Sequence, residues 1–201
     1  MTQAKENAAK WIFAAAAAAS VIAVALICVF LFAGGIPGMM KIGVWEFLSG
    51  TRWRPGNDIY GILPMILGSL YVTAGALLIG APAGLLTAVY LSRFASPRMT
   101  RILRPAVSLL AGIPSVVYGF WGVTTIVPLI RRYFGGSGSS LLAAALLLGI
   151  MILPTIIAVS EAALNAAPRS YYEGALALGA THERAVFSVV LRAARSGVIA
   201  A

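Results

Sequence analysis

Charged residues are scarce in this sequence: Asp, Glu, Lys and Arg make up only 10% of its 201 residues, whereas an ordinary soluble domain is about a quarter charged. So few charges cannot cover a water-facing surface, which argues against a soluble globular enzyme. The single cysteine, Cys28, excludes an intramolecular disulfide and any cysteine-rich metal site. Histidine also occurs once, at His182, where we expect an exposed helix-start residue and no bound metal.

Hydrophobic residues, by contrast, make up 60% of the chain, and the mean hydropathy is +0.92. A helix that crosses a bilayer needs about 20 apolar residues, and four stretches provide them without a charge. We therefore predict an all-α polytopic membrane bundle with spans at 11–33, 61–91, 105–130 and 141–160. The first stretch follows two lysines, as in a signal peptide, but it is longer than the roughly 7–15 apolar residues of a signal core. We expect it to be retained.

The third predicted span is interrupted by Pro114 and Pro128. Irregular backbone at membrane depth is tolerated only where protein or a water-filled cavity satisfies its polar groups. This span is therefore the best candidate in the chain for lining a pathway. If it is re-entrant and does not cross, the last segment of the chain lies on the opposite side of the membrane.

The net charge of +9 is distributed unevenly between the predicted spans. Cytoplasmic loops carry the excess of Lys and Arg, so we place the N-terminus in the cytoplasm, with ten of the 15 Lys and Arg residues inside. The segments between spans are then a cytoplasmic tail at 1–10, an external segment at 34–60, a cytoplasmic basic loop at 92–104, an external turn at 131–140 and a cytoplasmic segment at 161–201. We expect Arg93, Arg98, Arg101 and Arg104 of the basic loop to contact lipid headgroups.

The last cytoplasmic segment has the spacing of two short helices. Ser170 stands three residues before Glu173, as in a capping box, and predicts a helix over about 171–178. Gly179 supplies the left-handed conformation that commonly ends a helix. Thr181 can then cap a second helix. The sequence therefore predicts a helical hairpin with a glycine turn.

This hairpin carries a family resemblance. Glu173-Gly174-Ala175 followed by Gly179 resembles the EAA motif of bacterial ABC importer permeases, although Gly174 stands where the family often has alanine and Leu191-Arg192 stands where many members have Leu-Pro. In that family the motif forms coupling helices that sit in a groove of the cytoplasmic ATPase. The resemblance therefore implies a role in ATPase coupling for Ser170, Glu173, Gly174, Ala175 and Gly179.

A second stretch, Leu110–Gly119 with the sequence LAGIPSVVYG, is similar to the signature of the phosphate-specific ABC permease, C-type subunit. The resemblance covers nearly the whole chain from Trp45 onward. It implies a permease subunit of an ATP-driven, binding-protein-dependent phosphate importer in the cytoplasmic membrane of a bacterium. The implied partners are two ATP-binding subunits, a second related permease, a periplasmic or extracellular phosphate-binding protein and membrane lipid. No cofactor is implied for this chain.

Members of that family carry about two further spans after the EAA loop, including an Arg and a Glu associated with phosphate passage. The resemblance thus implies that this chain is truncated at its C-terminus. The four predicted spans hold no charge that would compensate an anion. Pro114, Ser115, Tyr118 and Gly119 are the candidate pathway residues, because they offer hydroxyls and a helix start whose N–H groups can bind anions. Ser115 and Tyr118 could equally hold helices together.

Other functions are compatible with parts of this pattern. The chain could be an ABC permease for another small anion, or a non-transport membrane sensor that uses the hairpin for docking. The interval from Ala175 to Gly179 also occurs in helix-turn-helix proteins, but a recognition helix held at a membrane has poor access to DNA, so we expect no nucleic acid. A secondary transporter is disfavoured, because such carriers usually place an ionisable residue in a span and the four predicted spans contain none. The carboxylates lack a partner His or Ser, so we predict no enzyme activity and no catalytic residue.

Overall fold

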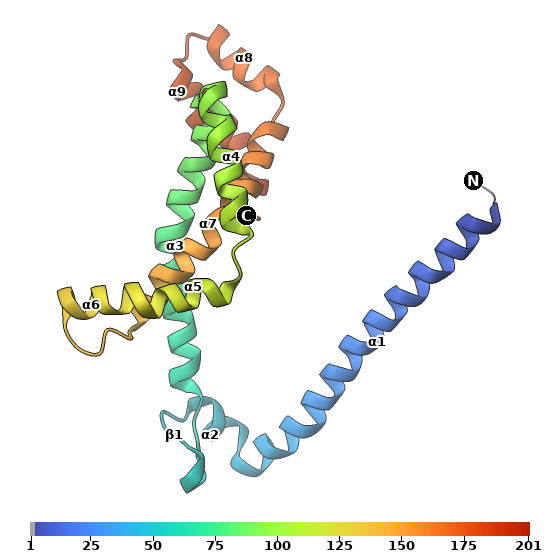
Figure 1. Ribbon diagram of the computed structural model, residues 1–201, viewed down its shortest axis with the longest axis vertical. Coiled ribbons are helices and arrows are strands. Elements are labelled where there is room, and N and C mark those ends of the chain that lie inside the picture. Colours follow the sequence, from blue (N-terminus) through green and yellow to red (C-terminus); the bar gives the residue numbers. More distant parts are fainter. Residues whose placement is uncertain (1–2) are drawn as a thin grey trace. The chain divides into compact units, whose positions relative to one another are not determined.

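The computed structural model of the protein describes residues 3–201, and the chain divides into two compact units, residues 1–67 and 68–201. Both units are almost entirely helical (Figure 1). Three helical segments are individually long and apolar enough to cross a membrane: Glu6–Ile42, Leu63–Phe94 and Leu141–Ala166. The all-α prediction is confirmed, and the described residues contain only two strands, of two residues each.

The first unit begins with one long helix, α1 (Gln3–Ile42), followed by α2 (Val44–Ser49). The strands β1 (Trp53–Arg54) and β2 (Ile59–Tyr60) then pair antiparallel around a short 3-10 turn, η1 (Pro55–Asn57). Most described apolar side chains of α1 are exposed, with Met39 and Ile42 at its end half-buried, which suits a helix surrounded by lipid.

Helix α1 continues past the predicted end of the first span at residue 33, through Pro37 to Ile42. The external segment predicted from residue 34 therefore starts inside a helix. The glycine and proline residues at positions 34–38 suggested that the helix ends there. Membrane helices tolerate both residues where the freed backbone groups are satisfied again locally.

The second unit is organised around two parallel helices, α3 (Leu63–Val89), which begins at the end of the first unit, and α7 (Leu141–Ala166). Small residues bring their backbones close together. A Cβ atom added to Gly80 would lie 2.8 Å from the carbonyl oxygen of Gly149, and one added to Gly84 would lie 2.7 Å from Ile156. Close backbone approach through small residues is a common way to pack helices in a bilayer, where no hydrophobic effect drives helices together.

The segment at 92–104, predicted as a cytoplasmic basic loop, is largely helical. The end of α3 passes into a π-helical turn, η2 (Tyr90–Phe94), and α4 (Pro97–Ala111) begins two residues later. The physical reason is a strong helix start: the Ser96 hydroxyl accepts a hydrogen bond from the backbone N–H of Met99, and Pro97 occupies the first helical turn.

The third predicted span is two helical pieces with a bend of 91° between them. After the break at residues 112–114, α5 (Ser115–Trp121), the π-helical turn η3 (Gly122–Ile126) and α6 (Val127–Phe134) run away from α4, as Figure 1 shows. Pro114 precedes α5 and marks the break, as predicted. Pro128 does not break the helix, because it lies in the first turn of α6, directly after the π-helical turn.

The chain ends in a series of short helices: α8 (Arg169–Ala177), α9 (His182–Ala185), the π-helical turn η4 (Val186–Val190), α10 (Leu191–Ala193) and α11 (Arg195–Ile199). The main buried cluster joins them to the ends of α3 and α7. Leu164 and Val186 are fully buried there, with Ala88, Val89 and Val190 around them. The α8–α9 hairpin is thus fixed to both long helices of the unit.

Replacing Gly80 by alanine should destabilise the α3–α7 contact, because the new methyl group would meet the Gly149 backbone, which cannot rotate away. We expect a loss of about 1–3 kcal/mol, the usual range for overpacking. The measurement is the thermal stability of the purified protein in detergent. Gly68→Ala on the same helix is the matched control, since nothing lies within 4 Å of its added Cβ. Equal stability of the two variants would contradict the close packing at Gly80.

Candidate functional site

The turn of the hairpin has the geometry that the sequence predicted. Gly179 has φ +83°, in the left-handed region that side chains rarely adopt. The N–H of Ala180 donates to the carbonyl of Ala175 at 3.0 Å, and the N–H of Gly179 donates to that of Leu176 at 2.9 Å. These two bonds form a Schellman motif, which satisfies the last carbonyls of α8. On the other side of the turn, the Thr181 hydroxyl accepts from the N–H of Arg184 and caps α9, as predicted.

The predicted capping box of Ser170 and Glu173 does not form. Helix α8 starts at Arg169, directly after the extended Pro168, so Ser170 lies inside the first turn and not before it. The start shifts because the carbonyl of Pro168 already accepts a helical bond from Tyr171. Glu173 is consequently not used inside the chain: it is exposed and makes no hydrogen bond or ion pair among the described residues. Its carboxylate is available to a partner.

The outer side of the hairpin combines this free carboxylate with apolar side chains. Leu178 is 91% exposed at the turn, and Tyr171 and Leu176 are also exposed. Ala175 faces inward and is buried. A single exposed leucine is common on protein surfaces, but several exposed apolar side chains close to a free charge are also the composition that a protein interface uses.

His182 connects the hairpin to the end of α3, a contact that the sequence analysis missed. Its Nδ1 lies 2.8 Å from the hydroxyl oxygen of Tyr172 in α8, and its ring packs edge-on against Phe94 of η2, with ring centroids 4.7 Å apart. The side chain is half-buried and not exposed as expected. Tyr172 and His182 are ten residues apart, and Phe94 is far away in sequence, so no local pattern points to this cluster.

Glu183, next to His182, stabilises the start of α9. Hydrogen bonds from its own backbone N–H and from the Thr181 hydroxyl lower the pKa of Glu183 below its ordinary value. A carboxylate in the first turn also interacts favourably with the helix dipole. Glu173 and Glu183 therefore differ in role: Glu183 is engaged in capping, and Glu173 is not.

Two of the four arginines of the basic segment make contacts with α7 that the sequence analysis did not predict. Arg93 donates to the carbonyl of Leu164 at 2.6 Å, one of the last carbonyls of α7. The guanidinium of Arg104 donates to the carboxylate of Glu161, its Nε at 2.8 Å. Ser92 adds a bond to the side chain of Asn165. The sequence separations of 57 to 73 residues explain why these pairs could not be predicted.

The candidate pathway residues lie at the bend, apart from the hairpin. Tyr118 is buried, and its hydroxyl donates to the carbonyl of Leu110 at 3.0 Å, across the break between α4 and α5. This hydroxyl therefore stabilises the bend, one of the two roles that the sequence left open. Pro114 and Ser115 are exposed, and Gly119 lines a pocket.

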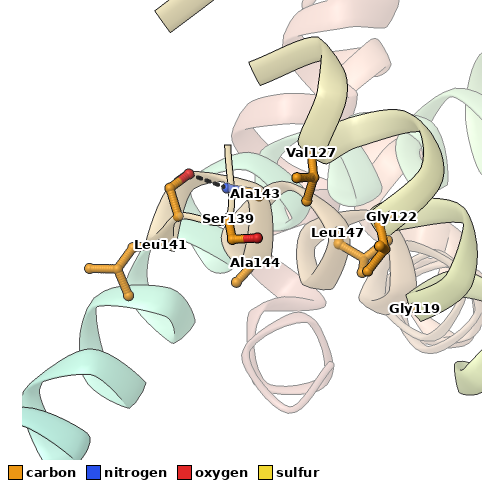
Figure 2. A pocket seen from close by; sticks show the side chains of 10 residues that line it. Gly119, Gly122, Val127, Ser139, Leu141, Ala143, Ala144 and Leu147 are labelled. Atoms are coloured by element: carbon orange, nitrogen blue, oxygen red, sulfur yellow. Dashed lines mark hydrogen bonds between the residues drawn. The ribbon is translucent and has the colours of Figure 1, made fainter. Parts of the chain in front are cut away.

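That pocket, of about 510 Å³, lies between the α5–α6 segment and the start of α7. Gly119, Gly122 and Val127 line it from the α5–α6 segment, and Ala143, Ala144 and Leu147 line it from α7, with Leu147 beside Gly122 in Figure 2. Ser140 lines it too, but its hydroxyl accepts from the N–H of Ala143. No charged side chain reaches the pocket, so it has no group that would compensate an anion. Among the described residues there is also no cluster of His, Cys, Asp or Glu that could hold a metal ion.

Comparison with known proteins matches this chain both to a family model and to individual transport permeases. Residues 80–201 match the family model of the binding-protein-dependent transport system inner membrane component. The chain is 40% identical over 197 residues to a probable ABC transporter permease protein, YqgH, of Bacillus subtilis, covering 96% of this chain and 64% of that protein. It is 32% identical over 193 residues to the phosphate transport system permease protein PstC of Mesorhizobium japonicum, covering 86% of this chain and 59% of the relative.

The PstC protein of Haemophilus influenzae is also 32% identical, over 199 residues that cover 85% of this chain and 63% of the relative. The chain thus spans less than two thirds of the length of these relatives. No solved structure matches it. The family match covers the second unit from Gly80 onward, including the α3–α7 pair, the bend and the hairpin. This chain therefore belongs to the family of binding-protein-dependent transport system inner membrane components, which are multi-pass membrane permeases.

Proposed function

We propose that the chain is a permease subunit of an ATP-driven importer of inorganic phosphate. The observation that carries this proposal is the α8–α9 hairpin, which presents an unpaired carboxylate and exposed apolar side chains while its base is fixed to both long helices. Phosphate is favoured as the substrate because several relatives at 30–32% identity are described as phosphate transport system permeases. The chain needs no catalytic group or cofactor of its own in this function, since ATP hydrolysis takes place in the partner subunits.

The proposed partners follow from this arrangement. Two cytoplasmic ATP-binding subunits would bind the hairpin, with Ser170, Glu173, Gly174, Ala175 and Gly179 forming or supporting the contact. A second, related permease would complete the pathway, because the apolar pocket beside Gly119 offers no cation to an anion. A phosphate-binding protein would deliver substrate on the opposite side of the membrane. In this assembly the N-terminus and the hairpin lie on the cytoplasmic side.

The hairpin can transmit a displacement by two routes. The first leads through η4, whose Val186 and Val190 pack with Leu164 of α7 and with Val89 of α3. The second leads from α8 through Tyr172 and His182 to Phe94 at the end of α3. Because both routes end on the same helix pair, ATPase motion would move α3 and α7 together. The bend held by Tyr118 separates α5 and α6 from this movement and lets the pathway segment respond differently.

Gly179→Val should uncouple ATP hydrolysis from uptake. A β-branched residue at φ +83° is strained by about 1–3 kcal/mol, so the Schellman turn should open. The assay is uptake of labelled phosphate, with sulfate for comparison, by proteoliposomes containing the complex. Wild-type complex should take up phosphate with ATP. Gly179→Asn is the control, because asparagine adopts the left-handed conformation at this position more readily than valine does. Phosphate uptake by Gly179→Val at the wild-type level, per ATP hydrolysed, would refute the role of the turn.

Glu173→Lys should weaken binding of the ATP-binding subunits and leave membrane insertion unchanged, because the side chain is exposed and makes no internal contact. We expect a loss of about tenfold or more in affinity, as for an interfacial charge that loses its partner. Pull-down of the ATPase measures this. Glu46→Lys makes the same change of charge at an exposed position outside the hairpin. If both variants lose binding equally, net charge and not the α8 face controls the association.

His182→Ala should leave the ATP-binding subunits bound but reduce the phosphate transported per ATP hydrolysed, because it removes the link between α8 and Phe94. Tyr172→Phe removes only the hydrogen bond and should have a smaller effect. Arg184→Ala, an exposed neighbour, is the control. An unchanged ratio of transport to hydrolysis in His182→Ala would show that the η4 route suffices.

A further inference from the structure

A groove of about 590 Å³ runs between the end of α3 and the first two turns of α4. Its polar lining consists of Arg101, Arg104 and Thr100, and its apolar walls include Leu91, Pro97 and Pro105. The groove lies at the end of the unit that carries the hairpin, outside the apolar pocket near Gly119. Neither the coupling hairpin nor the pathway uses it in the function proposed above.

The groove carries positive charge that the chain does not neutralise. No Asp or Glu occurs between residues 59 and 160, so this part of the chain supplies no counter-charge. Arg104 is paired with Glu161 through Nε and Nη2, whereas Arg101 makes no ion pair or hydrogen bond within the described chain. The N-terminus of α4 adds the positive end of a helix dipole. An anion bound in this groove would therefore find a cation without a partner.

The apolar surroundings indicate that the anion belongs to an amphiphile. Two prolines and a leucine form the walls, and Met99 and Ile102 are exposed on α4 beside the arginines, Ile102 by 67%. A small hydrated ion gains nothing from such walls. A phospholipid places its phosphodiester among cations and its glycerol and acyl chains against apolar side chains. Because the chain belongs to a family of membrane proteins, lipid is the amphiphile that surrounds it.

We propose that this groove is a binding site for the headgroup of an anionic phospholipid, with the phosphodiester on Arg101 and the free guanidinium edge of Arg104. The acyl chains lie along the exposed apolar side chains of α4. The bound lipid bridges the end of α3 and the start of α4 at the level where Arg104 also holds α7. The site requires a membrane-embedded permease but does not depend on the transported substrate, so it can be tested independently of phosphate import.

The test is native mass spectrometry of the full chain, purified with its partners where it forms a complex, and exposed to phosphatidylglycerol or phosphatidylcholine. We expect retention of phosphatidylglycerol in preference to phosphatidylcholine. Arg101→Gln should weaken that retention about tenfold, as expected for loss of one charge-assisted contact, and Arg101→Lys should retain part of it. Arg98→Gln is the matched control, because Arg98 is exposed on the same helix but does not line the groove.

Each other result would overturn the proposal. Equal losses in Arg98→Gln and Arg101→Gln would indicate diffuse attraction to a basic surface and not a site. Displacement of the lipid by a millimolar excess of inorganic phosphate would assign the groove to the free anion. Equal retention of both lipids, or of neither, would exclude recognition of the charged headgroup. If Arg101→Gln is not recovered folded, the comparison of Arg101→Lys with wild type still decides, since lysine keeps the charge but loses the planar fork.

Discussion

The buried contact of Leu164 with Val186 and Val190 is the interaction on which the rest of the second unit depends. It joins the end of α7 to the helical segment after the hairpin, and Ala88 and Val89 of α3 complete the cluster. Burying a valine or leucine side chain is worth about 1.5–3 kcal/mol each, so peeling the hairpin away would cost several times the energy of one surface contact. A partner that pulls on the exposed face of α8 would therefore move the helix pair before it detached the hairpin.

At the bend at residues 112–114, the backbone groups that a helix leaves unpaired at its end find other partners. The N–H of Gly112 bonds back to the carbonyls of Ser108 and Leu109, and the carbonyl of Leu110 receives the Tyr118 hydroxyl. Pro114 has no N–H to leave unsatisfied. Together these features allow an abrupt change of direction within three residues of an apolar chain. The described hydroxyls of this region likewise bond to nearby backbone carbonyls, as Tyr118 does to Leu110 and Thr124 to Phe120.

Local sequence predicted the features that arise from local physics. Gly179 was predicted as a left-handed turn because few other residues tolerate that backbone, and Thr181 as a cap because its hydroxyl can reach the next turn. Ser170 met the same rule for capping, yet Pro168 starts the helix two residues earlier and displaces it. A spacing motif therefore predicts that a helix begins nearby, whereas the preceding proline decides where.

The partners of the arginines could not be predicted in this way. The positive-inside rule counts charged residues in each loop and does not say which way each side chain points. Arg93 caps the end of α7 and Arg104 pairs with Glu161, so both hold helices together, while Arg98 and Arg101 remain without partners in the described chain. Each inward arginine fixes α7 to the segment that follows α3, close to the base of the hairpin. The ends of α3, α4 and α7 nearest the hairpin are consequently linked by charged and polar bonds as well as by packing. Farther along, α3 and α7 are held together by packing, with Gly80 and Gly84 of α3 set against Gly149 and Ile156 of α7. This difference makes the hairpin end the stiffer part of the unit, and a displacement applied there reaches all three helices at once.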